Sequence, residues 1–268
     1  EVPPPVVRVV MLCLMGLVLV VAATRRRQLL DRSIREATER ANLARYLPPE
    51  IAALLASGDT ARLRQGWERP VGVLIADIRG FTGHAEQLDP ATLSAFLADF
   101  RRLVSEAARA HGGVVDKFVG DNALIVMGVP ETRADDAART LACARTLLSR
   151  IDAWNACPRP PPLAGARLRV GVGAHFGQAF VGAVGTDERL EFTVLGDTVN
   201  VASRLEQLTR QTDGGLIASA KLLAAAEEQV ASSTPESGRW QALGGSAIRG
   251  RSEPLEIFHW VPPEEPKA

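Results

Sequence analysis

Two aspartates lie at the ends of predicted strands. Asp77 comes at the end of an apolar run, 71–78, that predicts a buried strand, and Asp121 lies in a tight turn between two further predicted strands. Neighbouring strands lie about 4.8 Å apart, so carboxylates at the same end of a sheet can bridge a pair of cations, as two-metal phosphoryl chemistry requires. Each aspartate also fits a plainer role, Asp77 as a helix cap and Asp121 as a turn former.

The residues after Asp77 offer groups that bind anions. Gly80 opens the next predicted helix, and the backbone N–H groups of Phe81 and Thr82 would lie at its N-terminus. Such N–H groups, together with the helix dipole, favour phosphate oxygens. We therefore expect Phe81 and Thr82 to contact a triphosphate.

A second pair of polar residues lies later in the chain. Asn200 and Arg204 are four residues apart on a predicted helix over 198–208. This spacing places their Cβ atoms about 5–6 Å apart on one face, so both can act on one ligand. The alternative is that Arg204 pairs with Glu206 or another surface acid and that Asn200 has no particular role.

A mixed pattern of helices and strands positions these side chains. Helices are expected over 90–110, 132–154 and 198–208, and strands over 71–78, 114–119 and 123–127, with a hairpin over 167–184 turning near Phe176–Gly177 and short strands near 216, 248 and 257. This order predicts an α+β domain over 70–261 with a ferredoxin-like, split βαβ core. The tail, 262–268, is expected to fray.

An apolar segment near the start predicts a transmembrane helix over 6–24. Three arginines, 25–27, follow at once, and positive charge marks the cytoplasmic side of a span. We expect the span to lie in the inner (plasma) membrane and the rest of the chain to be cytoplasmic. A cleaved signal peptide is the alternative, favoured by Ala22 and Ala23 but opposed by the arginines. Because the chain begins with Glu1, it is expected to be the C-terminal part of a longer protein.

Residues 25–69 are expected to form a helical stalk and connector. Apolar residues recur there at alternating steps of four and three, as in a short parallel coiled coil, at Leu30, Ile34, Ala37, Ala41 and Ala44. An amphipathic helix that lies on its own domain is nearly as consistent with so few repeats.

Composition excludes several classes of protein. The chain has 31 basic and 31 acidic residues, and a nucleic-acid binder normally shows a basic excess. Its three cysteines, Cys13, Cys143 and Cys157, have no metal-ligand spacing and fit a reducing compartment. The four scattered histidines predict no chemistry.

Three segments together resemble class III nucleotide cyclases. They are Ala-Asp-Ile-Arg-Gly-Phe-Thr at 76–82, Lys-Phe-Val-Gly-Asp at 117–121 and Gly-Asp-Thr-Val-Asn-Val-Ala-Ser-Arg at 196–204. The resemblance runs from about 71 to 259. It implies that Asp77 and Asp121, with the Ile78 carbonyl, bind two Mg²⁺ or Mn²⁺ ions.

The same resemblance assigns roles to four further residues. Asn200 and Arg204 would steady the ribose and the pentavalent phosphorus, where an arginine offsets growing negative charge. Arg169 matches a phosphate-contacting arginine of the family. At position 249 the family usually has lysine. Arg249 keeps the positive charge but changes the geometry of the hydrogen-bond donors. Alternatively, Arg249 is an ordinary surface arginine.

The base is expected to be adenine. In the family, Lys117 and Thr193 match base-selecting positions, which hold glutamate and cysteine in guanine-specific members. A lysine can donate to adenine N1, which is an acceptor, whereas guanine N1 carries a hydrogen. The pair resembles a subclass with threonine in place of aspartate, several of whose members respond to bicarbonate. Alternatively, Thr193 is an ordinary β-branched strand residue.

The resemblance implies an adenylate cyclase that turns ATP into 3′,5′-cyclic AMP and pyrophosphate for signal transduction, as a homodimer. In the family, one protomer supplies the equivalents of Asp77, Asp121 and Arg169, and the other supplies those of Lys117, Thr193, Asn200, Arg204 and Arg249. Residues 45–51 resemble, more weakly, the connector of cyclases with a CHASE2-type sensor.

Three rival interpretations remain. A guanylate cyclase is opposed by Lys117, and a diguanylate cyclase by the absence of a Gly-Gly-acid-acid-Phe turn before Asn122. A degenerate domain that only binds nucleotide typically lacks a metal aspartate or the Asn/Arg pair. This chain has both metal aspartates, Asp77 and Asp121, and the pair Asn200 and Arg204.

Overall fold

The computed structural model describes residues 14–17, 25–27, 64–158, 167–186, 190–212, 215–229, 239–246 and 254–263. The chain divides into two compact units, 1–52 and 53–268, and the elements named below belong to the second. In the first unit, 14–17 and 25–27 are helical. Within the described residues, no helix is both long and apolar enough to cross a bilayer. Most of the span expected over 6–24 and of the stalk expected over 25–69 falls outside these residues.

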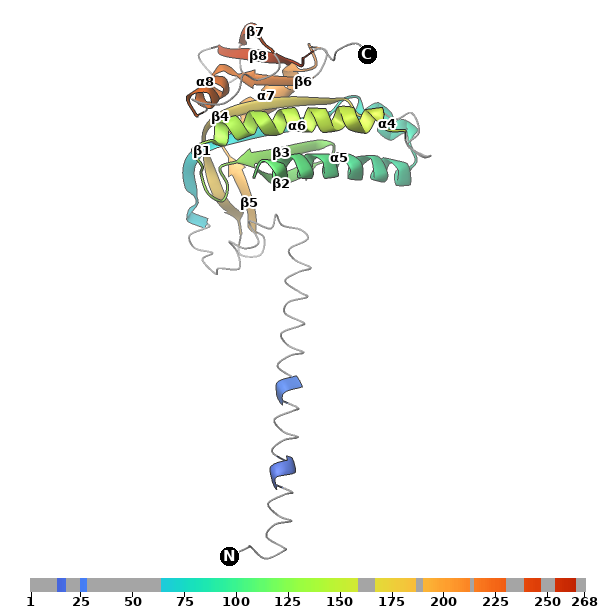
Figure 1. Cartoon of the computed structure of the whole chain (residues 1–268), viewed down its shortest axis with the longest axis vertical. Coiled ribbons are helices and arrows are strands. Elements are labelled where there is room, and N and C mark those ends of the chain that lie inside the picture. Colours follow the sequence, from blue (N-terminus) through green and yellow to red (C-terminus); the bar gives the residue numbers. More distant parts are fainter. Residues whose placement is uncertain are drawn as a thin grey trace, which may run out of the picture. The chain divides into compact units, whose positions relative to one another are not determined.

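A sheet of eight strands forms the centre of the second unit (Figure 1). The strands are β1 (Trp67–Ile78), β2 (Val114–Val119), β3 (Asn122–Met127), β4 (Val170–Gly185), β5 (Leu190–Leu195), β6 (Gly215–Ser219), β7 (Arg239–Ser246) and β8 (Leu255–Val261). They run in the order β2-β3-β1-β4-β6-β8-β7, and β5 pairs with β4 outside this path. β1 is central and antiparallel to both β3 and β4, which is the arrangement that a split βαβ core predicts.

Helices cover both faces of the sheet. They are α4 (Phe81–Gln87), α5 (Pro90–Ala110), α6 (Asp136–Ala156), α7 (Asp197–Leu208) and α8 (Ala220–Gln229). Side chains of α5, α6 and α8, such as Phe100 and Leu147, share one buried cluster with the sheet. Val201 and Leu205 of α7 belong to a second cluster with Ile217 of β6. The sheet therefore has α5, α6 and α8 on one face and α7 on the other.

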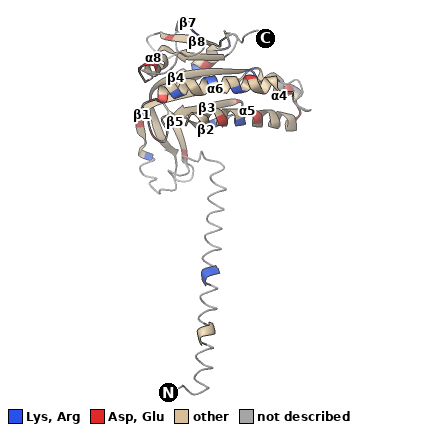
Figure 2. Ribbon diagram, viewed as in Figure 1, with Lys and Arg blue, Asp and Glu red and all other residues tan. Residues whose placement is uncertain are grey.

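The helix α5 begins where its sequence predicts. The Asp89 carboxylate accepts hydrogen bonds from the N–H groups of Ala91 and Thr92 at 3.0 and 3.1 Å, and Pro90 occupies the first helical position. Both features satisfy or remove N–H groups that a helix start leaves unpaired. Figure 2 shows acidic and basic positions interspersed along this helix.

The hairpin predicted over 167–184 is wrong. Residues 170–185 form one continuous strand, β4, whose hairpin partner is β5. A Cβ on Gly173 would lie 2.2 Å from the Ala202 carbonyl oxygen, and one on Gly177 would lie 2.6 Å from Thr198 Oγ1. These glycines therefore let α7 approach the strand closely and do not form a turn.

Candidate functional site

Asp77 and Asp121 are neighbours at the end of β1. Asp77 pairs in register with Asn122 of β3, and the Ile78 N–H donates to the Asp121 carbonyl across 3.4 Å. Gly120, with φ +62°, adopts the left-handed conformation in the turn that leads into β3. The juxtaposition is the one that the sequence predicts, and the metal-binding role stays a prediction.

The carboxyl group of Asp77 lies in a negative, partly buried environment. Burial raises its pKa to about 6, and the negative charges of Glu206 and Asp121 contribute in the same direction. Two arginines oppose the shift: Arg79 Nη1 lies 3.9 Å and Arg210 Nη2 lies 3.6 Å from Asp77 Oδ2. The arginines do not fully offset burial and the nearby acids, so a bound cation would relieve the remaining cost of the charged form.

The donor chemistry at this end of β1 fits a hard divalent cation. Asp77 and Asp121 supply carboxylate oxygens, and the Ile78 backbone supplies a carbonyl, which are the ligand types that Mg²⁺ and Mn²⁺ prefer. In the described part of the chain, no cluster of three or more His, Cys, Asp or Glu side chains forms a complete metal cage. Mg²⁺ in nucleotide enzymes is commonly held by one or two carboxylates and completed by substrate phosphates, so the donor set is sufficient.

Arg79 links the turn after Asp77 to the helix α7. Its Nη2 lies 2.8 Å from Glu206 Oε1 and donates to the Glu206 backbone carbonyl at 3.0 Å. The guanidinium lies against Gly171 of β4, where an added Cβ would come within 1.7 Å of Nη2. Glu206 is therefore a buried partner of Arg79 and not a surface acid, whereas the pairing of Arg204 with another acid is not tested by this contact.

Arg169 lies beside the same turn. Its carbonyl accepts a hydrogen bond of 2.7 Å from the Arg79 N–H, and its side chain is exposed. Phe81 and Thr82 open α4; the Phe81 side chain packs partly against the core cluster, and Thr82 is exposed. Their predicted phosphate contacts stay predictions, and Arg249 lies outside the described residues.

Asn200 and Arg204 lie on α7. Asn200 is exposed and Arg204 is half-buried, whereas Glu206 on the same helix faces the sheet and is buried. A helix rises 1.5 Å per residue, so Asn200 lies about 9 Å along the axis from Glu206. Within one chain, the exposed Asn200 therefore lies apart from the buried Arg79–Glu206 contact that adjoins Asp77.

Lys117 of β2 and Thr193 of β5 both contact Asp116 where these two strands approach each other. Thr193 Oγ1 donates to Asp116 Oδ2 at 3.0 Å, and Lys117 forms ion pairs with Asp116, at 3.7 Å, and with Glu191. The register of β2 against β3 shifts between Val115 and Lys117, which leaves Asp116 as the extra residue of a β-bulge. The bulge breaks the alternation of side chains, so two consecutive residues both contact β5.

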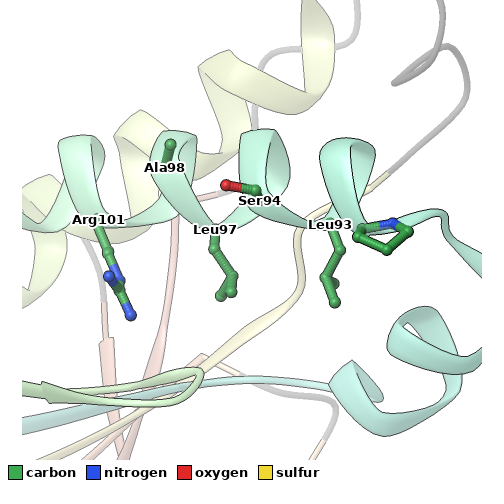
Figure 3. Close-up of a pocket in the computed structure, with 6 residues that line it drawn as sticks. Leu93, Ser94, Leu97, Ala98 and Arg101 are labelled. Atoms are coloured by element: carbon green, nitrogen blue, oxygen red, sulfur yellow. The ribbon is translucent and has the colours of Figure 1, made fainter.

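An open hollow of about 370 Å³ runs along α5 but does not include the residues predicted to act on the substrate. Figure 3 shows Leu93, Leu97 and Arg101 directed into it. Arg101 also lies 5.2 Å from the centre of the Phe118 ring and donates to the Gly120 carbonyl at 3.5 Å. This side chain therefore braces the turn that carries Asp121.

Two site residues, Glu206 and Asp116, were missed from the sequence. The spacing of the buried positions Thr198, Ala202 and Leu205 extends to Glu206, so helical periodicity already placed an acid on the face that packs against the sheet. Such an acid needs a buried partner. Asp116 had no comparable signal, because a strand pattern does not reveal a bulge.

The chain resembles proteins of one catalytic family. Residues 65–236, more than half of the chain, match the family model for the adenylate and guanylate cyclase catalytic domain. Adenylate cyclase 1 of Rhizobium meliloti is 32% identical over 81% of this chain and 31% of that protein. An adenylate cyclase of Anabaena cylindrica is 28% identical over 80% of this chain and 41% of that protein. This chain thus spans about a third of the length of the curated relatives it matches.

Solved structures agree with the sequence comparisons. The adenylyl cyclase CyaB from P. aeruginosa is 27% identical, with a TM-score of 0.58, over 74% of this chain and 96% of that chain. The guanylyl cyclase Cya2 is 28% identical, with a TM-score of 0.62, over 75% of this chain and 96% of that chain. The two are about equally similar, so overall likeness does not separate the bases. The chain belongs to the adenylate and guanylate cyclase catalytic domain family.

Proposed function

We propose that this chain is an adenylate cyclase that converts ATP to 3′,5′-cyclic AMP and pyrophosphate. The adjacent carboxylates of Asp77 and Asp121 carry the proposal, because they provide oxygen ligands where a cyclase domain needs them. In the reaction, the ribose 3′-oxygen loses its proton and bonds to the α-phosphorus, and the bond from that phosphorus to the leaving pyrophosphate breaks.

Two cations would be held by Asp77, Asp121 and the Ile78 carbonyl. When bound, Mg²⁺ or Mn²⁺ lowers the pKa of a coordinated hydroxyl and stabilises charge on the phosphate oxygens. The protein's part is to keep the two carboxylates close together. The nearby guanidinium groups of Arg79 and Arg210 favour the charged form of Asp77.

The arginines and the asparagine would act on the rest of the nucleotide. Arg169 is exposed beside the turn that follows Asp77, so it can pair with the triphosphate. Asn200 would orient the ribose through its amide. Arg204, four residues later on α7, would offset the charge that grows on the α-phosphate in the transition state.

We propose that Lys117 and Thr193 select adenine, as in the subclass with threonine at the second position. Their elements contact each other through Asp116 and Glu191, so the two residues can address one base. The Lys117 ammonium has only donors, which suits adenine N1 and opposes the N1–H of guanine. The sequence is about equally identical to an adenylyl cyclase and to a guanylyl cyclase, so the proposed choice of base rests on Lys117 and Thr193.

We propose that the site is shared between two chains. Asn200 lies on the exposed side of α7, away from the buried Arg79–Glu206 contact beside Asp77. Large apolar residues are also exposed on β2 and β5, which carry the base-selecting pair, at Val119 and Leu195, and on β4, at Val184. A second copy would cover these side chains and bring its own Asn200 to Asp77, which gives two equivalent sites in a two-fold dimer.

The test of activity uses the full chain, purified in detergent because of the membrane span proposed over 6–24. Incubation with ATP and Mn²⁺ should yield cyclic AMP and pyrophosphate in equal amounts, resolved by chromatography. Asp77→Ala, prepared in parallel, should yield neither product above background. Tight binding of an ATP analogue without turnover by the unsubstituted chain would instead indicate a nucleotide-binding module.

A further inference from the structure

Asp116 has no role in the mechanism above, yet it lies between the two residues proposed to select the base. Its side chain is 4% exposed, and its Oδ2 atom is 3.0 Å from Thr193 Oγ1 and 3.7 Å from Lys117 Nζ. One oxygen of this nearly buried carboxylate thus contacts both the Thr193 hydroxyl and the Lys117 ammonium. The bulge in β2 allows this arrangement, because it turns Asp116 and Lys117 toward β5 together.

The direction of the hydrogen bond to Thr193 follows from the chemistry of the two groups. An ionised carboxylate has only acceptors, and a threonine hydroxyl has one proton. Thr193 must therefore donate that proton to Asp116, and its remaining lone pairs only accept. A threonine without such a partner would rotate its hydroxyl to suit either a donor or an acceptor, and would discriminate poorly.

Adenine and guanine carry different hydrogen-bonding groups at position 6. Adenine carries a 6-amino group, which donates, and guanine carries a 6-oxo group, which accepts. A hydroxyl oxygen that is fixed as an acceptor complements adenine and opposes guanine. We infer that Asp116 is a positioning residue for base selection: it holds the Thr193 hydroxyl as an acceptor, and so makes a threonine specific for ATP. This inference rests on the proposed function.

The ionisation of Asp116 supports the same assignment. Burial raises its pKa to about 6, although the Lys117 ammonium and the Thr193 hydroxyl oppose the shift. At the pH near 8 at which such an assay is run, the group is ionised and can only accept. The Lys117 ammonium that faces it is shared with Glu191 on β5, so the lysine has a second partner when Asp116 is removed.

The test is the ratio of kcat/KM for ATP to kcat/KM for GTP, measured with the full chain at pH 8. Asp116→Ala frees the threonine hydroxyl and should lower this ratio at least about tenfold, because selectivity is a difference of transition-state affinities. Asp116→Asn, of nearly the same size, should lower it less, since its amide can still accept from Thr193. Circular dichroism and melting curves check that both variants fold.

A double-substitution cycle separates positioning from a purely structural role. Thr193→Val removes the hydroxyl and keeps the branched shape. In that background, Asp116→Ala should change the ATP/GTP ratio by less than about twofold, because no hydroxyl remains to be oriented. Glu191→Gln removes the other partner of Lys117 and should leave the ratio near that of the unsubstituted chain. Asp136→Asn changes another buried acid, which accepts a hydrogen bond from the Arg133 N–H. It is the control that shows whether loss of a buried carboxylate by itself changes the ATP/GTP ratio.

Two results would overturn the inference. One is an ATP/GTP ratio that stays within about twofold in Asp116→Ala, or an equal loss of activity with both nucleotides. The other is an equal fall in the ratio with and without the Thr193 hydroxyl. Competition binding of ATPαS against GTPαS gives the same comparison without turnover. Absence of cyclic AMP from the unsubstituted chain would therefore contradict the proposed function and leave this inference to be decided by binding.

Discussion

Arg79 and Glu206 form an ion pair that joins the metal-site turn to α7, with 2.8 Å between Nη2 and Oε1. Arg79 follows Asp77 by two residues, and Glu206 lies two residues after Arg204 on the helix that carries Asn200. The pair crosses β4 at Gly171, where only a glycine leaves room for the guanidinium. It therefore fixes the position of α7 relative to the two aspartates.

Breaking this pair should destabilise the domain. Glu206→Gln removes the nearer counter-charge of the largely buried Arg79 guanidinium and leaves it only Asp77, at 3.9 Å, so we expect the free energy of unfolding to fall by about 2 kcal/mol. Urea denaturation followed by circular dichroism measures the change. The exposed acid Glu227 on α8 provides a control, because Glu227→Gln should change stability by less than about 0.5 kcal/mol. Equal stability of the two variants would mean that the pair contributes nothing.

Loss of either proposed metal ligand should abolish turnover without unfolding the protein. Asp77→Ala and Asp121→Ala each remove a carboxylate that is not needed by the core, so melting temperatures should stay close to that of the unsubstituted chain. Cyclic AMP formation with Mn²⁺ should fall by at least about a thousandfold. Turnover within about threefold of the unsubstituted chain in either variant would refute the assignment.

The raised pKa of Asp116 predicts how stability depends on pH. Its value of about 6 in the folded protein lies above the ordinary 3.8, so the folded state binds a proton more tightly than the unfolded state. Tighter proton binding stabilises the folded state. This stabilisation is fully present below pH 3.8 and is lost as pH rises through 6. Asp116→Asn does not titrate, so its stability relative to the unsubstituted chain should improve by roughly 2 kcal/mol between pH 4 and pH 8.

Denaturant unfolding at several pH values measures this difference. The exposed acid Asp135, which precedes α6, serves as the control, because Asp135→Asn should show little change in relative stability over the same range. A difference between Asp116→Asn and the unsubstituted chain that is constant from pH 4 to pH 8 would show that the carboxyl titrates normally.

Replacement of both base-selecting residues should shift the enzyme toward guanine. Lys117→Glu and Thr193→Cys together place guanine-type residues at both positions, so kcat/KM for GTP should rise relative to that for ATP by at least about tenfold. Product chromatography with equal concentrations of ATP and GTP measures the ratio. An unchanged ratio in an active double variant would mean that other residues read the base.

Local patterns predicted much of the fold around the site. The apolar run that ends at Ile78, the N-capped helix α5 and the strands of the β2–β3 hairpin all lie close to their expected bounds. The neighbouring positions of Asp77 and Asp121 followed from that hairpin, because its turn returns the chain to the end of β1.

Features that depend on tertiary packing were not predicted. Gly173 and Gly177 looked like part of a turn, and only the close approach of α7 explains them. The short helix α8 was missed, since its alanine-rich sequence gave little periodicity. Asp116 became part of the site through a bulge, and Glu206 through a contact with a residue 127 positions away.

Mixing two inactive variants tests the central claim, an adenylate cyclase site shared by two chains, most directly. Asp77→Ala and Asn200→Ala are purified separately, combined in equal amounts under conditions in which labelled subunits are shown to exchange, and assayed for cyclic AMP. Each mixed dimer has one site with both lesions and one with neither. Half of the dimers are mixed, so activity should recover to about one quarter of the unsubstituted level. Activity that stays at the level of the single variants despite exchange would place the whole site in one chain and contradict the account.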